Sequence, residues 1–460
     1  MYVADTIVAP ATPPGRGAVA IIRLSGKEAI AIARTLWRPR KPGELRPREL
    51  RLGAIRDPSS GATIDEALCV IFPAPHSLTG EDVVELHCHG GVYLVRRILA
   101  LTADLGARLA QPGEFARRAY LNGRIDLTRA EAIADLVEAR GEEALVRATA
   151  QLSGALARHV EGLREKVIGI RAYLEAEIDF ADEDLDLPSR AQLASSINEL
   201  ADSVRLLRDS FARGRIAREG VRVALIGKPN AGKSSILNLL LGSNRAIVTP
   251  IPGTTRDVIE ESISLGPWSV VLSDTAGLRD SVEPIEQLGI ARTRAAADEA
   301  DLLLAVFDSS RPFDSDDAQV VAATRERSGI ALLNKCDLAA RLDRERLRAE
   351  GMKLRVVEFC ALTAYGLAEL RRHLEVTIDQ MAGGPQTDGS PAITRERHRV
   401  ALDQALAALQ AAHDAALASM PPEIVAVDVA RAADALASIT GAVSTEDVLD
   451  AVFSQFCIGK

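Results

Sequence analysis

Apolar residues recur at helical spacing along a segment in the first half of the chain. The pattern consists of Leu156, Val160, Leu163, Val167, Ile170, Leu174 and Ile178. Steps that alternate between four and three residues place these side chains on one stripe of a long helix, which is typical of a helical bundle core. A residue pattern typical of helices begins near Asp126 and resumes from Thr394 to the end of the chain. Two distant segments are therefore predicted to be helical.

Shorter apolar runs indicate strands in two other parts of the chain. Residues 1–119 combine the runs AVAIIRLSG, ALCVIFPA and DVVELHCHG with one helical pattern and many Pro and Gly residues, which is typical of an α+β domain. From Gly220 to about residue 380, strand, loop and helix patterns alternate, and MAGGPQTDGSP at 381–391 indicates a linker. Since helical texture lies on both sides of this α/β part, we expect it to be inserted into the helical domain.

These patterns predict a multidomain fold that combines α/β and all-α parts. The N-terminal α+β domain would span residues 1–119, the discontinuous helical domain residues 120–215 and 385–460, and the inserted domain residues 216–384. A chain of 460 residues fits about three domains of ordinary size.

Composition narrows the possible functions. The chain has 55 Lys and Arg against 64 Asp and Glu, a formal net charge of -9, whereas dedicated nucleic-acid binders are usually basic. Any contact with RNA is therefore expected through a local basic patch or a partner. Aromatic residues make up 3% of the chain, which argues against an aromatic stacking platform. No apolar run has the length of a membrane span, and no secretory signal is evident, so we expect a cytoplasmic protein without membrane attachment.

The cysteines fit a reducing compartment. They are Cys69, Cys88, Cys336, Cys360 and Cys457. Because none forms a CxxC pair, a disulfide framework and a zinc site are both disfavoured. His87 and His89 would share one face of a strand while Cys88 points to the other, so a metal cluster is disfavoured there too. Cys69, Cys336 and Cys360 are expected to be packing residues.

The segment VRVALIGKPNAGKSSILNLL carries the strongest chemical signal. A predicted strand leads into Gly227-Lys-Pro-Asn-Ala-Gly-Lys-Ser234, which matches GxxxxGKS and precedes a predicted helix. The glycines let backbone N–H groups surround phosphates, and the helix N-terminus faces the anion. Lys233 would contact the β- and γ-phosphates, and the Ser234 hydroxyl would bind Mg²⁺.

Three further motifs follow in the order of a GTPase. Asp274-Thr-Ala-Gly277 ends an apolar strand, and the switch-like stretch GTTRD at 253–257 precedes it. In Asn334-Lys-Cys-Asp337, the carboxylate can accept two N–H bonds from guanine, which adenine does not offer. The motifs predict a P-loop G domain, with candidate GTP-binding residues Asn230, Ala231, Gly232, Lys233, Ser234, Ser235, Asp274, Thr275, Ala276, Gly277, Asn334, Lys335 and Asp337.

The residue after DTAG is Leu278, where Ras-like proteins have a glutamine that orients the attacking water. Another group must therefore position water and neutralise charge in the transition state. Glu286 is a candidate for the first task, and a monovalent cation held by Asn230 is a candidate for the second. The alternatives are that Glu286 is an ordinary solvated residue and that Arg256 or Arg279 acts in cis.

Taken together, the chain resembles the bacterial tRNA-modification GTPase family MnmE, also called TrmE, over essentially its whole length. The resemblance is carried by DTIVAPATPPGRGAVAIIRLSG, LTGEDVVELHCHGG, QPGEFARRAYLNGRIDL, RAEAIADLVEA, GKPNAGKSSILN, IVTPIPGTTRD, DTAGLR, NKCD and the terminal FCIGK. The GTPase motifs are widely shared, whereas the first three stretches and the ending are specific to the family. The family's architecture is a folate-binding α/β domain, a helical domain and an inserted G domain.

The resemblance also implies a reaction and its partners. The family forms a homodimer through its N-terminal domains and works with a flavoprotein, MnmG, in a heterotetramer that carries FAD on the partner only. Together they install an aminomethyl or carboxymethylaminomethyl group on carbon 5 of the wobble uridine of certain tRNAs. The carbon comes from a tetrahydrofolate derivative, 5-formyl- or 5,10-methylene-tetrahydrofolate. GTP hydrolysis drives or gates the reaction, and potassium stabilises G domains that meet across the dimer.

By position, the resemblance assigns further residues. The potassium ligands would be Asn230, Thr249, Ile251 and Thr254. Thr255 would join Ser234 on Mg²⁺, and Glu286 would orient the catalytic water. The GTP-binding set gains Thr249, Thr254, Thr255, Cys360 and Ala361. The family usually has Ser-Ala at these last two positions, but the base contact normally comes from a backbone N–H, so GTP binding is expected to survive.

The folate positions that the resemblance implies are Arg23, Glu81, Arg124 and Lys460. Cations could bind the glutamate tail of a folate, and a carboxylate could pair with its pterin ring. The family commonly has Lys in place of Arg124, so the charge is kept but the donor geometry differs.

The tail FCIGK leaves two interpretations open. Cys-Ile-Gly-Lys departs from a prenylation box, and a disulfide partner is lacking. We expect the tail to bring a thiol and a cation to the folate site, with Cys457 in the chemistry or lining it. Alternatively, Phe453 and Phe456 anchor the last helix and Cys457 only packs with them.

Two rival functions remain. A ribosome-assembly GTPase of the Era or Der type would leave about 200 residues before the GTPase motifs unexplained, and no KH-like or second G domain follows them. A regulatory folate-binding GTPase scaffold would have no chemistry of its own. The chain has no GxGxxG strand–helix unit for FAD, so the sequence distinguishes this scaffold poorly from the tRNA-modifying enzyme.

Overall fold

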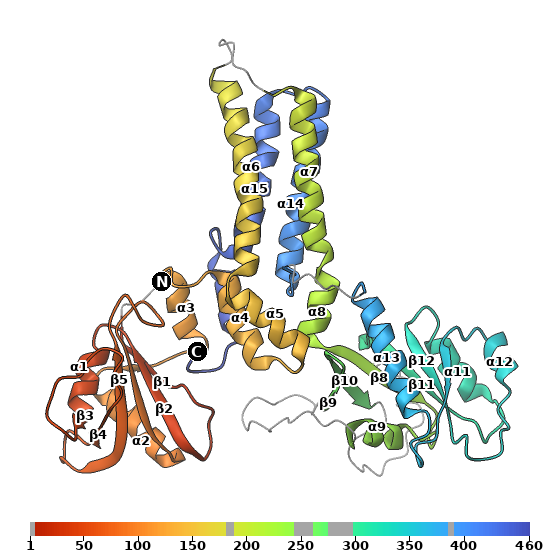
Figure 1. Ribbon diagram of the computed structural model, residues 1–460, viewed down its shortest axis with the longest axis horizontal. Coiled ribbons are helices and arrows are strands. Elements are labelled where there is room, and N and C mark those ends of the chain that lie inside the picture. Colours follow the sequence, from red (N-terminus) through yellow and green to blue (C-terminus); the bar gives the residue numbers. More distant parts are fainter. Residues whose placement is uncertain (1–4, 181–187, 243–260, 275–297, 385–390) are drawn as a thin grey trace.

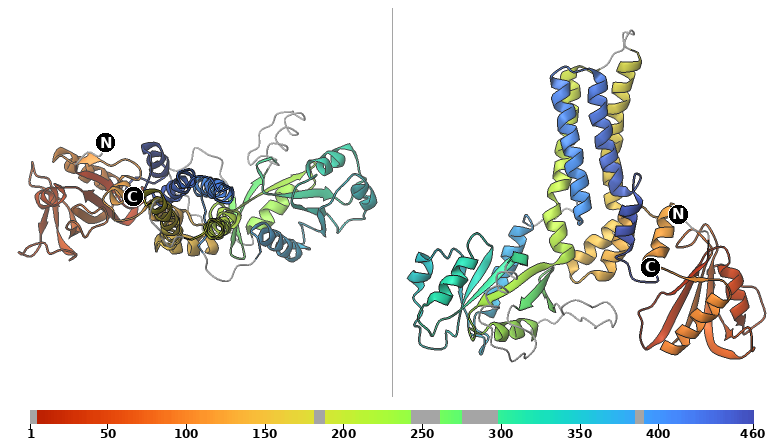
Figure 2. Two further views of the ribbon diagram at one scale, coloured as in Figure 1. Left: turned by 90° about the horizontal axis from the view of Figure 1, so that it is seen from above. Right: turned by 180° about the vertical axis from the view of Figure 1, so that it is seen from behind.

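The chain forms three parts, and the central one includes an upright helical bundle (Figure 1). The computed structural model describes residues 5–180, 188–242, 261–274, 298–384 and 391–460. An N-terminal part and an inserted α/β part lie on opposite sides of the foot of the bundle, and Figure 2 shows the same separation from above and from behind. The arrangement confirms the predicted fold class, in which α/β and all-α parts are combined.

The N-terminal part is built on a seven-stranded sheet with the order β3-β4-β5-β6-β2-β1-β7. Its strands are β1 (Ile7–Pro10), β2 (Gly17–Ser25), β3 (Trp37–Pro39), β4 (Arg51–Arg56), β5 (Thr63–Phe72), β6 (Val83–Gly90) and β7 (Arg108–Leu109). Its helices are α1 (Ala29–Leu36), α2 (Val92–Asp104) and α3 (Glu114–Leu121). Residues along β6 alternate between the two faces, so Cys88 is buried in the core while His89 is exposed on the other face.

The helical part contains eight helices among the described residues. They are α4 (Leu127–Glu138), α5 (Glu142–Leu152), α6 (Ala155–Asp179), α7 (Arg190–Asp209), α8 (Phe211–Glu219), α14 (Glu396–Leu417), α15 (Pro422–Thr440) and α16 (Glu446–Phe453). The predicted stripe on α6 does face the bundle core. Five of its residues are buried, and Ile170 and Ile178 are partly buried. Helices from before and after the inserted part therefore share one core, which joins segments far apart in the sequence.

The inserted part is a six-stranded sheet with the order β13-β12-β11-β8-β10-β9. Its strands are β8 (Val221–Gly227), β9 (Glu261–Leu265), β10 (Trp268–Asp274), β11 (Leu302–Asp308), β12 (Gly329–Asn334) and β13 (Arg355–Glu358). Its helices are α9 (Lys233–Gly242), α11 (Ser315–Ala323), α12 (Arg344–Ala349) and α13 (Leu367–Met381). All seven residues of β11 are buried, as expected for a strand in a parallel sheet covered on both faces.

Parallel pairing brings the carboxyl ends of β8, β11 and β12 to the same edge of this sheet. Ligands of open α/β sheets bind at that edge. The GxxxxGKS motif follows β8 and the NKCD motif follows β12, so the fold places both motifs there.

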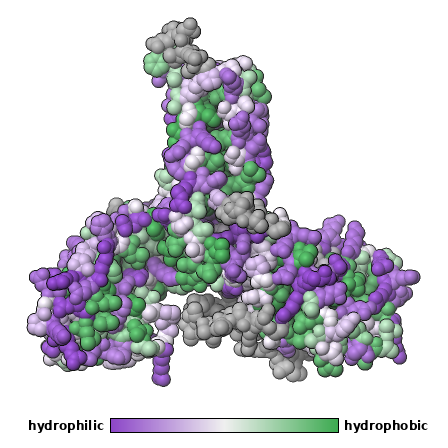
Figure 3. All heavy atoms as spheres, viewed as in Figure 1, coloured by the Kyte–Doolittle hydropathy of each residue, from purple (hydrophilic) through white to green (hydrophobic). Residues whose placement is uncertain are grey.

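The outer surface mixes hydrophilic and hydrophobic residues on the face shown in Figure 3. Within the described ranges, none of the helices is long and apolar enough to cross a membrane.

Candidate nucleotide-binding site and C-terminal tail

The loop between β8 and α9 has the backbone shape of an anion site. Asn230 and Gly232 have positive φ angles of 61° and 103°, and Gly227 has a φ of 155°. A Cβ at Gly232 would overlap the Nδ2 atom of Asn334, so only glycine fits there. The loop then enters the N-terminus of α9, where backbone N–H groups and the helix dipole favour a bound anion.

Lys233 is held inside this loop. Its Nζ donates hydrogen bonds to the carbonyl oxygens of Gly227 at 2.8 Å and Lys228 at 2.9 Å. Ser234 and Ser235 follow on the first turn of α9, where both residues are exposed. The ammonium and the Ser234 hydroxyl thus lie where a triphosphate and its Mg²⁺ would meet the loop.

Asn334 ties the NKCD motif to the phosphate loop. Its side chain is buried, its Nδ2 donates to the carbonyl of Ala231 at 2.7 Å, and its Oδ1 accepts from the N–H of Ala361 at 3.1 Å. One side chain therefore joins the phosphate loop, the NKCD motif and the Cys360-Ala361 loop. The motifs predicted the first two segments and the family resemblance the third, but neither predicted that Asn334 connects them.

Lys335 reinforces the connection. Its Nζ donates to the carbonyl of Asn230 at 2.9 Å and to Oδ2 of Asp308 at 2.6 Å. Burial raises the pKa of the Asp308 carboxyl, but hydrogen bonds from Lys335 and Ser310 outweigh it and hold the pKa below its usual value. Asp308 is therefore a charged anchor at the end of β11, which the sequence analysis did not identify.

Asp337 is exposed and is oriented by a thiol. The Sγ of Cys360 donates to Oδ1 of Asp337 at 3.1 Å, and Cys360 itself is buried. The expectation that Cys360 only packs is therefore incomplete, because its S–H group also holds the carboxylate predicted to recognise guanine. Cys69 is a packing residue as predicted, and burial raises the pKa of its thiol to about 12. Cys336 is only half-buried.

Several predicted residues lie outside the described ranges. They are Thr249, Ile251, Thr254, Thr255, Thr275, Ala276, Gly277 and Glu286. For Asp274, the backbone at the end of β10 is described, and it pairs with Leu225 of β8. The potassium ligands other than Asn230, the second Mg²⁺ ligand and the water-orienting glutamate therefore stay predictions.

The C-terminal residues return to the N-terminal part of the chain. Phe453 and Phe456 are buried, with ring centroids 5.6 Å apart, so the predicted anchoring of the last helix is confirmed. Cys457 is exposed instead of packed with them. Gly459 has a φ of 96°, and a Cβ there would overlap the carbonyl oxygen of Pro10 at the end of β1. Glycine therefore allows the tail to lie directly against this strand.

Arg23 of β2 contacts the tail. Its Nη1 donates to the carbonyl of Gly459 at 3.2 Å, and its Nε donates to Oε1 of Glu85 at 2.9 Å. The N–H of Phe115 donates to the backbone oxygen of Lys460 at 3.1 Å. Burial, together with the nearby Arg23 charge, lowers the pKa of the Lys460 ammonium. Arg23 and Lys460, both predicted folate residues, are thus brought together.

Glu81 and Arg124 lie at the neighbouring end of the same sheet. Glu81 accepts hydrogen bonds from the hydroxyl of Ser25 at 2.7 Å and from Nη1 of Arg118 at 3.1 Å. A Cβ at Gly80 would lie 3.3 Å from Cγ of Arg124, which places that side chain beside the Glu81 segment. Since Ser25 and Arg23 are two residues apart on β2, the four predicted folate residues gather in one region.

Arg118 is a component that the sequence analysis missed. It is 2% exposed, and its Nη2 donates to Oδ1 of Asp5 at 2.5 Å and to Oε1 of Glu114 at 3.1 Å. The one available signal was the Glu-x-x-x-Arg spacing in QPGEFARRAYLNGRIDL, which places Glu114 and Arg118 on one helix face. The cationic and carboxylate groups fit a ligand with both acidic and hydrogen-bonding parts.

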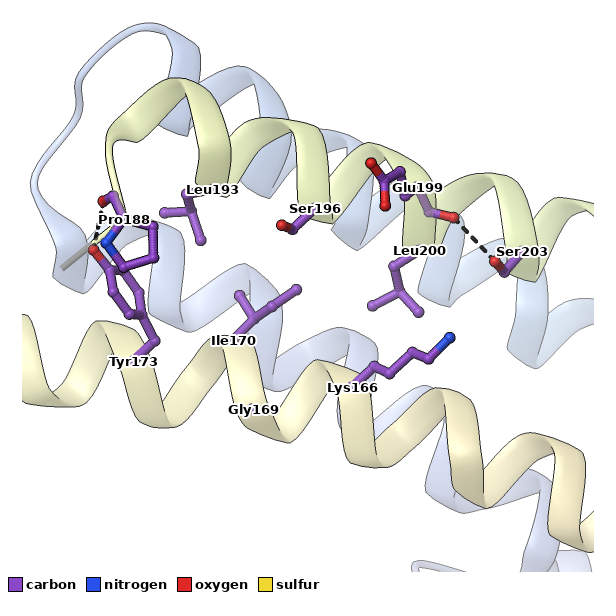
Figure 4. A pocket seen from close by; sticks show the side chains of 10 residues that line it. All are labelled: Lys166, Gly169, Ile170, Tyr173, Pro188, Leu193, Ser196, Glu199, Leu200 and Ser203. Carbon is purple, nitrogen blue, oxygen red and sulfur yellow. Dashed lines mark hydrogen bonds between the residues drawn. The ribbon is translucent and has the colours of Figure 1, made fainter.

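A groove lies apart from both regions, between α6 and α7 (Figure 4). Its volume is about 480 Å³, and it is lined by Lys166, Gly169, Ile170, Tyr173, Pro188, Leu193, Ser196, Glu199, Leu200 and Ser203. Helix α6 packs mainly on α15 and helix α7 mainly on α14, which leaves this side of the bundle open. None of the predicted site residues lines the groove. In the part of the chain that the structure describes, no cluster of metal-ligating side chains is present.

Known proteins match this chain along its whole length. The family profile described as "MnmE helical domain" matches residues 127–457, and the one described as "GTP-binding protein TrmE N-terminus" matches residues 6–124. The "tRNA modification GTPase MnmE" of Chloroflexus aurantiacus is 44% identical over 99% of this chain and 100% of its own length. Proteins of the same name from Moorella thermoacetica and Natranaerobius thermophilus are 44% and 39% identical, each over 99% of both chains.

Proposed function

Because the chain belongs to the MnmE family of tRNA modification GTPases, we propose that it hydrolyses GTP and takes part in tRNA modification. The observation that carries the GTPase proposal is the joining of the phosphate loop to the guanine-recognition motif. Asn334 and Lys335 both bond to carbonyls of that loop, so the two halves of a nucleotide site are held together before any ligand binds.

In this proposal, each half of the site has its own task. The backbone of the 227–234 loop and the Lys233 ammonium bind the phosphates, and Ser234 supplies an oxygen to Mg²⁺. Asp337 accepts two hydrogen bonds from guanine, while the Cys360 thiol fixes the orientation of its carboxylate. When bound, Mg²⁺ neutralises charge on the phosphates, and Thr255 is proposed as its second protein ligand.

The water and the transition-state charge need further groups, since Leu278 replaces the glutamine of Ras-like proteins. We propose Glu286 for orienting the water and K⁺ for the charge. The proposed K⁺ ligands are Asn230, Thr249, Ile251 and Thr254. The positive φ of 61° at Asn230 supports this assignment, because such backbone geometry at a non-glycine residue is uncommon and concentrates at functional sites.

As the one-carbon donor of the tRNA modification, we propose a tetrahydrofolate derivative that binds beside the C-terminal tail. Arg23, Arg124 and Lys460 would bind its carboxylates and Glu81 its pterin ring. Cys457 is exposed, and Gly459, two residues further along the tail, is bonded to Arg23, which supports a position of the thiol beside the proposed folate site. This exposure supports a role in the chemistry over the packing alternative.

The assembly is proposed on the same basis. We propose a homodimer formed through the N-terminal domains that works with an MnmG-type flavoprotein on tRNA in the cytoplasm, with FAD on the partner. The proposed domains are 1–119, 120–215 with 385–460, and 216–384. Helices α3 and α8 continue through two of these boundaries, so the domains are connected by helices and not by loops there.

Base specificity gives the sharpest test of the GTPase proposal. In Asp337→Asn, the carboxylate that accepts from guanine is replaced by an amide, which can instead donate to the second carbonyl of xanthine. We expect hydrolysis of GTP to fall by about 100-fold or more and hydrolysis of XTP to appear, measured as phosphate release with K⁺. The same assay with Na⁺ in place of K⁺ tests the cation. Unchanged GTP hydrolysis in the variant would contradict the proposal.

A further inference from the structure

Both connections between the G domain and the helical part are bonded to one carboxylate. Nε of Arg218 lies 2.9 Å from Oδ1 of Asp135 on α4, and Nη2 of Arg395 lies 2.6 Å from the same oxygen. Arg218 is two residues before Gly220, where α8 passes into β8, and Arg395 directly precedes α14. The chain thus enters and leaves the G domain beside Asp135, which is 8% exposed.

A second buried carboxylate fixes the start of α14 on α4. Glu131 is fully buried, its Oε2 accepts from Nη2 of Arg397 at 2.8 Å, and Nε2 of His398 lies 3.0 Å from the same atom. Burial would raise the pKa of Glu131, but His398 and Arg397 hold it well below its usual value. Because loss of one partner of a buried ion pair leaves an uncompensated charge, these contacts hold the start of α14, and with it the adjacent Arg395, against α4.

The same arginine reaches the C-terminal tail. Nη1 of Arg395 donates to Oε1 of Gln455 at 3.1 Å, two residues before Cys457. Phe453 and Phe456 pack in a cluster with Leu127, Ala130 and Ala134. Helix α4 therefore carries Asp135 and the residues on which the tail is seated.

On the G-domain side, the β9–β10 hairpin lies against the helical part. The hairpin separates the GTTRD and DTAG motifs in the sequence, so both of its outer ends lead toward motifs that are predicted to contact the nucleotide. At the turn, the N–H of Glu143 on α5 donates to the carbonyl of Pro267 at 3.2 Å. The guanidinium of Arg213 on α8 lies 5.3 Å from the ring centre of Trp268. A displacement of this hairpin would therefore shift or break its contacts with α5 and α8.

We propose that Asp135 and Arg395 are positioning residues that couple the nucleotide state of the G domain to the placement of the tail that carries Cys457. This inference rests on the proposed function. The contacts run from the hairpin through α5 and α8 to Asp135, from Asp135 to Arg395, and from Arg395 through Gln455 to the tail. Coupling between two sites is reciprocal, so a displaced tail also changes nucleotide affinity.

The reactivity of the Cys457 thiol reports the placement of the tail. The full-length protein is alkylated with iodoacetamide in GDP or in a non-hydrolysable GTP analogue, and mass spectrometry measures the rate at Cys457. In the wild type, we expect the two rates to differ by about fivefold or more, the lower end of typical coupling between sites. In Gln455→Leu, which removes the acceptor for Arg395, the ratio should fall below about twofold.

Two variants separate coupling from general destabilisation. Gln455→Glu keeps an acceptor of the same size and should preserve the nucleotide response. Arg399→Gln removes an arginine from the same helix as Arg397, but one whose ion pairs are with Glu396 and Asp403 and whose guanidinium lies 5.9 Å from the ring centre of Phe211. These contacts lie outside the proposed route, so this variant should also preserve the response. Thermal unfolding verifies that each variant is folded.

The coupling proposal is overturned if the wild-type rates are equal in the two nucleotides or if Gln455→Leu responds like the wild type. GTP hydrolysis is measured in the same samples. Absence of hydrolysis by the wild type would count against the proposed function itself, whereas hydrolysis with an unresponsive thiol would count against the coupling alone.

Discussion

The nucleotide site and the tail site are built in different ways. The nucleotide site uses loops at the ends of neighbouring parallel strands, and its shape depends on local backbone geometry at positions such as Gly232. The tail site joins residues that are 436 positions apart, Arg23 and Gly459, through a returning C-terminus. The first site can form within one domain, whereas the second requires that the last helix is already seated on α4. A substitution should therefore have its largest effect at the site in which it lies and a smaller effect, through the proposed coupling, at the other site.

The largest effect is expected at the phosphate loop. In Gly232→Ala, the added methyl group overlaps Nδ2 of Asn334 and breaks the link between the two halves of the site. We expect GTP affinity to fall by about 100-fold or more, measured by titration with a fluorescent GTP analogue. Gly383→Ala is a matched control, because Gly383 also has a positive φ, 83°, but nothing lies within 4 Å of its Cβ position. An equal loss in both variants would show that backbone strain alone is responsible.

A substitution in the tail is expected to have a smaller effect, and to reduce tRNA modification more than GTP affinity. In Gly459→Ala, the methyl group overlaps the carbonyl of Pro10, so the tail is displaced from β1. We expect wobble-uridine modification to fall by about tenfold, while GTP affinity changes less, by about fivefold at most, through the proposed coupling. Gly106→Ala has a similar φ of 100° with open space and should retain modification. If Gly459→Ala weakened GTP binding as strongly as modification, the separate construction of the two sites would be contradicted.

An intermediate test concerns the thiol that orients Asp337. Cys360→Ala removes the donor to the carboxylate, and GTP affinity should fall by about fivefold, the value of one modest hydrogen bond. Cys360→Ser restores a donor and should recover most of the affinity. Isothermal titration of GDP measures both, and the thiol has no orienting role if the alanine variant binds as the wild type does.

The smallest expected effect is a pH dependence of folding stability that arises from His398, at the start of α14. Burial and the nearby Arg397 outweigh the Glu131 carboxylate and hold the pKa of His398 below its ordinary value of 6.5, so the folded state keeps this ring neutral when the unfolded chain takes up a proton. Stability should therefore fall as the pH drops below 6.5, by up to about 1.4 kcal/mol per pH unit for one proton. His159 has a lowered pKa as well, so denaturant unfolding is compared in His398→Asn and His159→Asn. An unchanged slope in His398→Asn would contradict the assignment.

The contrast between the sites also explains what could be predicted from the sequence. The GxxxxGKS and NKCD motifs are contiguous, and their geometry follows from local residue types, so the sequence predicted where both would lie. Arg118 and Gln455 belong to no such motif. Helical spacing relates Arg118 only to Glu114, whereas the contacts of these two residues with Glu81 and Arg395 form only in the folded chain. The amphipathic stripe on α6 predicted a bundle core, but periodicity alone could not identify α14 and α15 as its partners.

The central claim is that the chain combines a GTPase with a tail that acts in tRNA modification. It is tested most directly by mass spectrometry of wobble-uridine nucleosides from a host that lacks its own gene for this function. The host is complemented with the wild type, Asp337→Asn or Cys457→Ser. We predict that the wild type restores the modified nucleoside and that both variants fail, with GTP hydrolysis intact in Cys457→Ser. A wild type that leaves the nucleosides as in the deletion strain would contradict the account and favour an assembly GTPase.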